Sequence, residues 1–495
     1  MTAFREDYLE LETRDNLSNP VTVSFRDPDG RLIVTEGRAF RVVNGELHQQ
    51  LKEFLSSPLF QQLVNARVLI NTWLVEDPIL QQQLARHAVS KSGVPLALEH
   101  EHIEFPSYPY EWPPEMLYAA GELTLNLMSM LGSESFGLKD ATPDNVLFHG
   151  PKPIFVDLLS IERRDQRDPT WLAYAQFVRT FIRPLLASKY FGIRLDQIFR
   201  VYRDGLQPEH VFRMSSNWQR LRPLFLTSVS LPALLSRIHP NRYQGIYQPK
   251  RSKSPDEASF ILGRQLRGLR RKLAAAKPAE TQRSVWRDYE SREQQSEAYA
   301  PAKQRFVEVA VREHKSAKVL DVGCNLGQFS LLAAAAGAFV VAIDQDPVVV
   351  GGLWRRAREA NLNILPLVVD LSRPTPGLGW RNSETRGFLD RALGAFDCVF
   401  MLAVIHHMLV TERIPLKEIL RLAWELTTDM FIVEFVSPED PMFRLLTRGN
   451  DHLYQYLTRE LFESACAEYF ITERTEQLAD CQRWIYQMRR RPTLA

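Results

Sequence analysis

The 495-residue chain has few cysteines, no apolar run long enough to cross a membrane, and no excess of charge of either sign. Its longest apolar run, residues 329–343, is shorter than a membrane-spanning helix requires. The balance of 61 basic and 59 acidic side chains gives no general indication of nucleic-acid binding. The cysteines are scattered without a C-x-x-C pair, so we expect neither disulfides nor a zinc site, and a cytoplasmic protein. They are Cys324, Cys398, Cys466 and Cys481.

The length exceeds what a single hydrophobic core usually supports, and the composition divides the chain into three regions. Residues 1–238 mix strand-like and helical pieces, which predicts an α+β domain. Residues 239–297 are polar and basic and are expected to form a linker. Its helix, expected over 261–277, carries a leucine stripe surrounded by arginines. We favour a solvated linker helix that docks its leucines between the domains over a phosphate- or membrane-binding patch. Residues 298–495 form the third region.

The third region alternates strand-like with helical segments, which predicts a parallel sheet covered on both faces. Its first strand runs into "VLDVGCNLGQFS" (319–330), where Gly323 and Gly327 stand in the turn before an apolar helix. Glycines in such a turn let the backbone approach a ligand closely. A dinucleotide-binding fold shares this feature, but the spacing here is G-x-x-x-G rather than G-x-G-x-x-G.

Chemically useful side chains follow the next strands. "FVVAID" ends at Asp344, suited to the two hydroxyls of a ribose, and "LPLVVD" ends at Asp370, suited to an adenine amino group. "FDCVFMLAVIHHM" brings Ala403, His406 and His407 to the same edge. An aspartate at one strand end would be unremarkable, but ligands bind beyond the carboxyl ends of parallel strands, so these ends are expected to form one crevice.

The motifs "VLDVGCNLG", "VVAID", "VVDLS" and "FDCVFMLAVIHH" resemble those of class I S-adenosylmethionine-dependent methyltransferases, over roughly residues 286–490. The resemblance implies a Rossmann-like, doubly wound, seven-stranded sheet with a late antiparallel strand near "RWIYQMRRR". It also implies that Asp344 holds the ribose, Asp370 the adenine, and four turn residues the methionine part. The implied cofactor-binding set is Asp321, Gly323, Asn325, Gly327, Asp344, Asp370, Leu371 and Ala403.

A narrower resemblance connects the chain with bacterial host-specific nodulation-type methyltransferases, through "PTPGLGWRNSETRGFLDR" and "IVEFVSPEDPMFRLL". The acceptor is left open: a sugar, lipid, peptide or small metabolite. For a hydroxyl or amine acceptor, His406 or His407 is the candidate base. Acceptor contacts are expected from the loop before the fourth strand, at Trp380, Asn382 and Glu384.

In the first region, "GLKDATPDNVLFHGPKPIFVDLLS" resembles the catalytic loop of protein kinases and aminoglycoside phosphotransferases, through Asp140, Asn145 and Asp157. No G-x-G-x-x-G and no V-A-I-K-like strand accompanies it, and Lys52 falls in a helical segment. We therefore expect a degenerate kinase-like domain that binds acceptor or partner. A bifunctional kinase–methyltransferase, a non-catalytic cofactor-binding protein and a simple capped turn are the alternatives.

Overall fold

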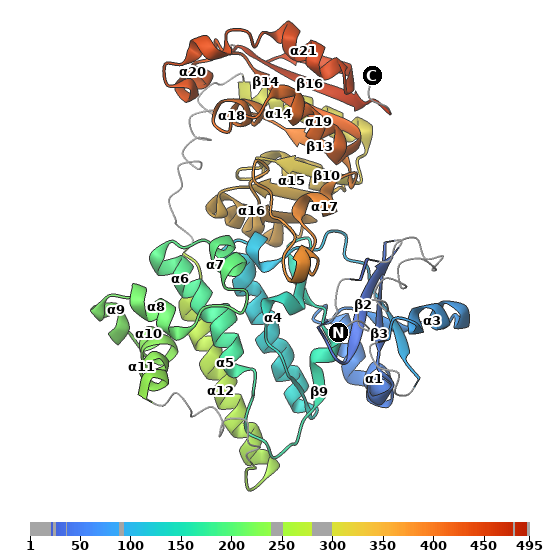
Figure 1. The fold of residues 1–495 in the computed structure, drawn as a ribbon, viewed down its shortest axis with the longest axis vertical. Helices are drawn as coiled ribbons and strands as arrows, with labels where there is room; N and C mark the ends of the chain where they lie inside the picture. The colour runs from blue at the N-terminus through green and yellow to red at the C-terminus, as the bar shows by residue number, and fades with distance from the viewer. Residues whose placement is uncertain are drawn as a thin grey trace, which may run out of the picture.

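The computed structural model describes residues 21–22, 26–35, 37–88, 94–238, 251–279, 299–478 and 481–492. Figure 1 shows two parts stacked along the longest axis, with the N-terminal part below and the C-terminal part above. None of the described helices combines the length and the apolar character that crossing a bilayer requires. All four cysteines have free thiols.

The N-terminal part begins with an antiparallel sheet of order β1-β2-β3-β5-β4. Its helices α1 and α2 connect β3 to β4, and Ser57 caps the start of α2 by accepting from the Phe60 N–H at 3.2 Å. The elements are β1 (Val21–Thr22), β2 (Gly30–Thr35), β3 (Arg38–Val43), α1 (His48–Leu55), α2 (Pro58–Asn65), β4 (Thr72–Leu74), α3 (Pro78–Ala85) and β5 (Leu96–His100).

A mostly helical lobe follows, built around the long buried helix α4. Two short strand pairs, β6 with β9 and β7 with β8, flank the segment that contains Asp140 and Asp157. The elements are η3 (Pro109–Glu111), α4 (Pro114–Ser133), β6 (Phe136–Leu138), β7 (Val146–His149), β8 (Lys152–Phe155), β9 (Ile161–Arg163), α5 (Tyr174–Phe177), α6 (Arg183–Phe191), α7 (Leu195–Val201), α8 (Pro208–Met214), α9 (Asn217–Leu221), α10 (Pro223–Phe225), η7 (Leu226–Ser230) and α11 (Leu231–Ile238).

The helix expected in the linker is α12 (Pro255–Ala276), which starts earlier than predicted because Ser254 caps it and Pro255 fits its first turn. Its leucine stripe is buried, and Leu273 lies against Gly121 of α4. Arg270 donates to the Leu125 carbonyl of α4 at 3.1 Å. The helix therefore packs on the N-terminal part rather than crossing between the two parts.

The C-terminal part contains a seven-stranded sheet of order β12-β11-β10-β13-β14-β16-β15, in which β16 runs antiparallel to both neighbours. This confirms the predicted Rossmann-like sheet and its late antiparallel strand. The elements are α14 (Tyr299–His314), β10 (Lys318–Val322), α15 (Gln328–Ala335), β11 (Phe339–Asp344), α16 (Pro347–Glu359), β12 (Ile364–Val368), α17 (Phe388–Ala392), β13 (Phe396–Met401), α18 (Ile405–Val410), α19 (Leu416–Leu426), β14 (Thr427–Val436), α20 (Pro441–Thr447), α21 (Arg459–Ala467), β15 (Phe470–Gln477) and β16 (Arg483–Arg490).

Successive side chains of the central strands enter different hydrophobic clusters on the two faces of this sheet. In β10, Val319 belongs to the cluster that includes α14, whereas Leu320 belongs to the large cluster on the other face. Both are fully buried, which explains why parallel strands read as continuous apolar runs.

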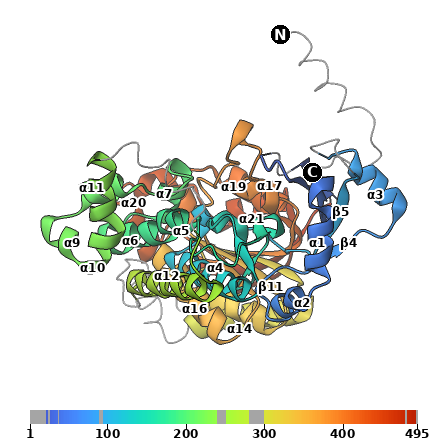
Figure 2. The same ribbon diagram turned by 90° about the horizontal axis from the view of Figure 1, so that it is seen from below.

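The two parts share one continuous core. Phe105, from the segment after β5, packs with ring centroids 5.9 Å from Phe388 and 5.8 Å from Phe396. Helix α16 lies against α4, so closely that a Cβ at Gly351 would stand 2.2 Å from the carboxylate of Glu115. Figure 2 shows the molecule from below, with the N-terminal part in front of the C-terminal part.

Candidate active site

The turn between β10 and α15 brings backbone to the edge of the sheet. Gly323 has φ +69°, and a Cβ there would lie 2.5 Å from the Val404 side chain, so only glycine fits. Its N–H donates to the Ile343 carbonyl at 2.9 Å, which ties the turn to the end of β11. Asn325 also has a left-handed backbone, with φ +48°.

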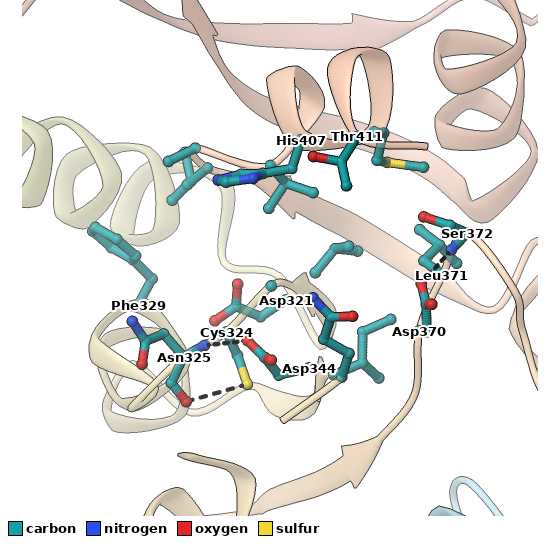
Figure 3. Close-up of a pocket in the computed structure, with 18 of the residues that line it drawn as sticks. Asp321, Cys324, Asn325, Phe329, Asp344, Asp370, Leu371, Ser372, His407 and Thr411 are labelled. Atoms are coloured by element: carbon teal, nitrogen blue, oxygen red, sulfur yellow. Dashed lines mark hydrogen bonds between the residues drawn. The ribbon is translucent and has the colours of Figure 1, made fainter. Parts of the chain in front are cut away.

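Asp344 stands at the end of β11 beside this turn. Its carboxylate accepts from the Asn325 N–H at 3.1 Å (Figure 3). It also accepts from the Asp346 N–H at 3.0 Å. Burial raises the pKa of Asp344 to about 6, although these backbone hydrogen bonds oppose the rise. The carboxylate is therefore fixed in orientation and able to accept further hydrogen bonds from a ligand.

Asp321, near the end of β10, is more deeply buried, with 2% of its surface exposed. It accepts a hydrogen bond from the Ser330 hydroxyl at 2.5 Å, and burial raises its pKa to about 7. Asp370 follows β12, and its carboxylate accepts from the Ser372 N–H at 2.9 Å. Ala403, after β13, has φ +56°, an uncommon conformation for a residue with a Cβ.

These strand ends meet in one cavity of about 400 Å³, within the usual range for small-molecule sites. The members of the predicted cofactor set that line it are Asp321, Gly323, Asn325, Asp344, Asp370, Leu371 and Ala403. The carboxylates can accept hydrogen bonds from hydroxyl and amino groups, and Leu371 and Phe329 offer apolar contact. These hydrogen-bond acceptors and apolar side chains fit S-adenosylmethionine.

Gly327 is the member of that set that does not line the cavity. It precedes α15 with φ +77°, and a Cβ there would lie 2.2 Å from the Leu353 side chain. Its place in the turn is explained by backbone conformation and helix packing rather than by ligand contact.

The two histidines of α18 have different surroundings. His407 lines the cavity and faces the side occupied by Asp321 and Asp344 (Figure 3). Burial, with a smaller contribution from Arg483, lowers the pKa of His407 to about 4, so its imidazole is neutral at physiological pH. His406 is buried behind it, outside the cavity lining, and neither of its ring nitrogens has a hydrogen-bond partner among the described residues.

A buried ionic cluster adjoins the cavity, and it depends on residues far apart in sequence. Lys303 of α14 lines the cavity and pairs at 2.7 Å with Glu434 of β14, which is fully buried. Tyr299 donates to Glu434 at 2.7 Å and accepts from Arg483 of β16 at 2.9 Å. Sequence reasoning missed Glu434 and Arg483, because no local motif marks them.

The predicted acceptor-contact residues do not line this cavity. Trp380 is 63% exposed, and it and Asn382 lie on the outer loop between β12 and α17. The Glu384 carboxylate, 8% exposed, instead pairs with Arg26 at 2.5 Å and with Arg203. Burial opposes ionisation, but these two guanidinium groups lower the pKa of Glu384 to about 2.

Glu384 lines a second cavity, of about 880 Å³, formed largely by the N-terminal part. Asp140, Asn145 and Asp157 line it too, so the fold brings the kinase-like residues together. Arg41 of β3 donates to Asp157 at 3.0 Å. The sequence pattern expected on an early strand was a V-A-I-K-like lysine. Arg41, in "RAFRVV", does not match that pattern, so it was not predicted to contact Asp157.

The two cavities lie at opposite ends of strand β13. Phe105 lines the second cavity and packs on Phe396, the first residue of the strand. Leu402 and Ala403, directly after its last residue, line the first cavity. A six-residue strand spans about 20 Å.

The geometry agrees with comparisons to known proteins. Residues 320–423 match the family model described as a methyltransferase domain. The nodulation protein NoeA of Rhizobium meliloti (strain 1021) is 29% identical over 453 residues, covering 90% of this chain and 91% of that protein.

Solved structures that match part of the chain include the following methyltransferases. The N-methyltransferase NodS from Bradyrhizobium japonicum WM9 is 13% identical, with a TM-score of 0.29, over 39% of this chain and 96% of that chain. Magnesium protoporphyrin IX methyltransferase (ChlM) from Synechocystis PCC 6803, solved with bound SAH, is 20% identical, with a TM-score of 0.27, over 39% of this chain and 86% of that chain.

The matched domain spans β11, β12 and β13 and all but the first two residues of β10, so it contains Asp321, Asp344, Asp370 and His407. The chain therefore carries a methyltransferase domain and is an S-adenosylmethionine-dependent methyltransferase.

Proposed function

We propose that the cavity at the ends of β10 to β13 holds S-adenosylmethionine and transfers its methyl group to an oxygen or nitrogen nucleophile. The observation that carries this proposal is the meeting of three strand-end carboxylates in one cavity opposite a neutral imidazole. Asp344 accepts from the ribose hydroxyls, Asp370 from the adenine amino group, and the turn at Gly323 and Asn325 supports the methionine part.

His407 is the proposed base of the reaction, whereas the sequence left the choice between His406 and His407 open. Its neutral imidazole can accept a proton, and it faces the cavity, whereas His406 is enclosed by protein. The cofactor supplies a methyl group already activated on a sulfonium sulfur. His407 would take the proton that the acceptor releases as the acceptor's lone pair accepts this methyl group.

The acceptor is a sugar, lipid, peptide or small metabolite in this proposal. The N-terminal part serves acceptor or partner binding through its own cavity. Because that cavity lies at the far end of β13, a small acceptor cannot occupy both cavities. The N-terminal cavity would therefore hold a distant part of a large acceptor or a separate ligand.

The free thiols support the cytoplasmic location expected from the sequence.

The test is transfer of a tritiated methyl group into fractionated lysate of the native host. Asp344→Ala and His407→Gln should both abolish labelling, but only Asp344→Ala should also weaken cofactor binding in calorimetry. Asp429→Ala is the matched control, because Asp429 lies near the start of β14, away from the cavity. Labelling by Asp344→Ala at the native level would disprove the pocket assignment.

Phosphoryl transfer in the N-terminal cavity is the second candidate, favoured by the convergence of Asp140, Asn145 and Asp157. Two observations count against it. Asp157 is already paired with Arg41, and the part of the chain that the structure describes contains no group of three or more His, Cys, Asp or Glu side chains that could hold a metal ion. ATP turnover that disappears in Asp157→Asn would support this candidate.

A further inference from the structure

The helices α8 to α11, residues 208–238, form a lobe at one lateral end of the molecule, as both ribbon views show (Figures 1 and 2). This lobe exposes a concentration of large apolar side chains. Trp218 is 84% exposed and Ile238 65%. The exposed set is Met214, Trp218, Leu221, Leu231, Leu234, Leu235 and Ile238.

Helix α11 turns its large apolar side chains toward solvent, whereas an ordinary surface helix buries them. Leu231, Leu234, Leu235 and Ile238 recur at positions i, i+3, i+4 and i+7, so they share one face, and all four are exposed. Ala233, between them in sequence, is buried. An outward apolar stripe of this kind is typical of a surface that contacts something other than water.

The net charge of the lobe is positive. Residues 208–238 contain four arginines and a single acid, Glu209, although the whole chain has nearly equal numbers of basic and acidic residues. Glu209 accepts a hydrogen bond from Ser236. Arg213 and Arg222 are exposed. Tryptophan and leucine beside uncompensated arginine form the composition of segments that lie in the headgroup region of anionic membranes.

The stretch before α7, outside the lobe, contacts the rim of the cofactor cavity. Arg194, which precedes α7, donates from its guanidinium to the Gln345 carbonyl at 2.8 Å, and Gln345 lines that cavity.

We propose that α8 to α11 dock the enzyme on an anionic lipid bilayer, with the α11 stripe and Trp218 entering the headgroup region and Arg213 and Arg222 facing lipid phosphates. This inference is independent of the proposed acceptor and of the transfer reaction. A bilayer is favoured over a second copy of the chain, because the lobe's excess of arginine would repel the same lobe of another molecule.

The test is co-sedimentation of the full-length protein with phosphatidylcholine vesicles made with and without phosphatidylglycerol. The native protein should sediment with the anionic vesicles and much less with the neutral ones. Leu234→Gln/Leu235→Gln should lower partitioning about tenfold or more, and Arg213→Gln/Arg222→Gln should lower it by roughly fivefold per charge removed. Trp218→Ser is an independent third variant.

Ile79→Gln is the matched control, since Ile79 is a comparably exposed apolar residue on α3, outside the lobe. It should bind vesicles as the native protein does, and all variants should keep the native cofactor affinity. Equal binding by the lobe variants and the control would overturn the proposal. So would light scattering showing a native dimer that Leu234→Gln/Leu235→Gln converts to monomer, because a second copy would then cover the stripe.

Discussion

At the scale of single residues, burial determines the protonation states in the cofactor cavity. Asp321 and Asp344 are carboxylates whose pKa values rise to about 7 and about 6, while the pKa of His407 falls to about 4. Near neutral pH the cavity therefore presents an ionised Asp344 to a ligand and a neutral imidazole to an acceptor. This division of roles follows from solvent exclusion more than from any pairwise contact.

Cofactor affinity should consequently fall on acidification. Ribose hydroxyls donate to the ionised form of Asp344, so below its folded-state pKa of about 6 the protein must release a proton to bind. The dissociation constant should then rise by up to about tenfold per pH unit. Calorimetry at several pH values between about 5 and 8 measures this dependence.

Asp344→Asn is the control for this prediction. It should bind weakly, with an affinity that changes less over the same range. If the affinity of this variant changed with pH as steeply as that of the native protein, Asp321 would be the group responsible. A native dissociation constant that does not change with pH would contradict the prediction.

At the scale of elements, a buried cluster of charges fixes α14, β14 and β16 beside the cavity. Arg483 of β16 donates to Asp440 at 2.8 Å and approaches Glu434 of β14 at 3.4 Å, and Lys303 of α14 pairs with the same glutamate. The cluster holds the antiparallel strand β16 in register against β14. It also sets the position of Tyr299, which lines the cavity.

Arg483→Met should lower the free energy of unfolding by about 3–5 kcal/mol, because it leaves Glu434 and Asp440 without their guanidinium partner in the core. Arg489→Met, in the same strand, removes an arginine that is half exposed and pairs with Asp429 and Glu473. That loss should be within about 1 kcal/mol. Urea titration of both variants compares them, and equal losses would contradict a structural role for the cluster.

At the scale of the whole molecule, the two parts are joined by a polar contact that is itself buried. Glu111, with no exposed surface, accepts from Thr375 at 2.6 Å and pairs with Arg391. The Arg391 guanidinium also lies over the ring of Phe105, 4.9 Å from its centroid. Since a half-satisfied buried ion pair is costly, this contact favours one relative placement of the two parts.

Arg391→Met should therefore destabilise both parts together, by roughly 3 kcal/mol. Arg373→Met is the control, because Arg373 also lies between β12 and β13 but is exposed and pairs with Glu412. Tryptophan fluorescence and circular dichroism should report one coincident transition in the native protein. Two separated transitions would show that the shared core does not couple the parts.

Sequence periodicity predicted the alternation of strands and helices and a parallel sheet covered on both faces. The seven strands and the antiparallel strand were expected from the resemblance to class I methyltransferases. Buried parallel strands are continuous apolar runs, and turn glycines are locally required. The positions of Asp344 and Asp370 at strand ends could also be read from the local sequence. Because ligands bind at the carboxyl edge of such sheets, the two residues were expected in one site.

Only the tertiary structure decided which histidine faces the cavity, that Glu384 turns toward Arg26 and Arg203, and that Arg41 meets Asp157. Each of these depends on side chains that approach from distant parts of the chain. The local sequence pattern determines which residues stand at the carboxyl edge of the sheet, because it sets where each strand ends. The side chains that face those residues are determined by packing between distant elements, and no short stretch of sequence contains that information.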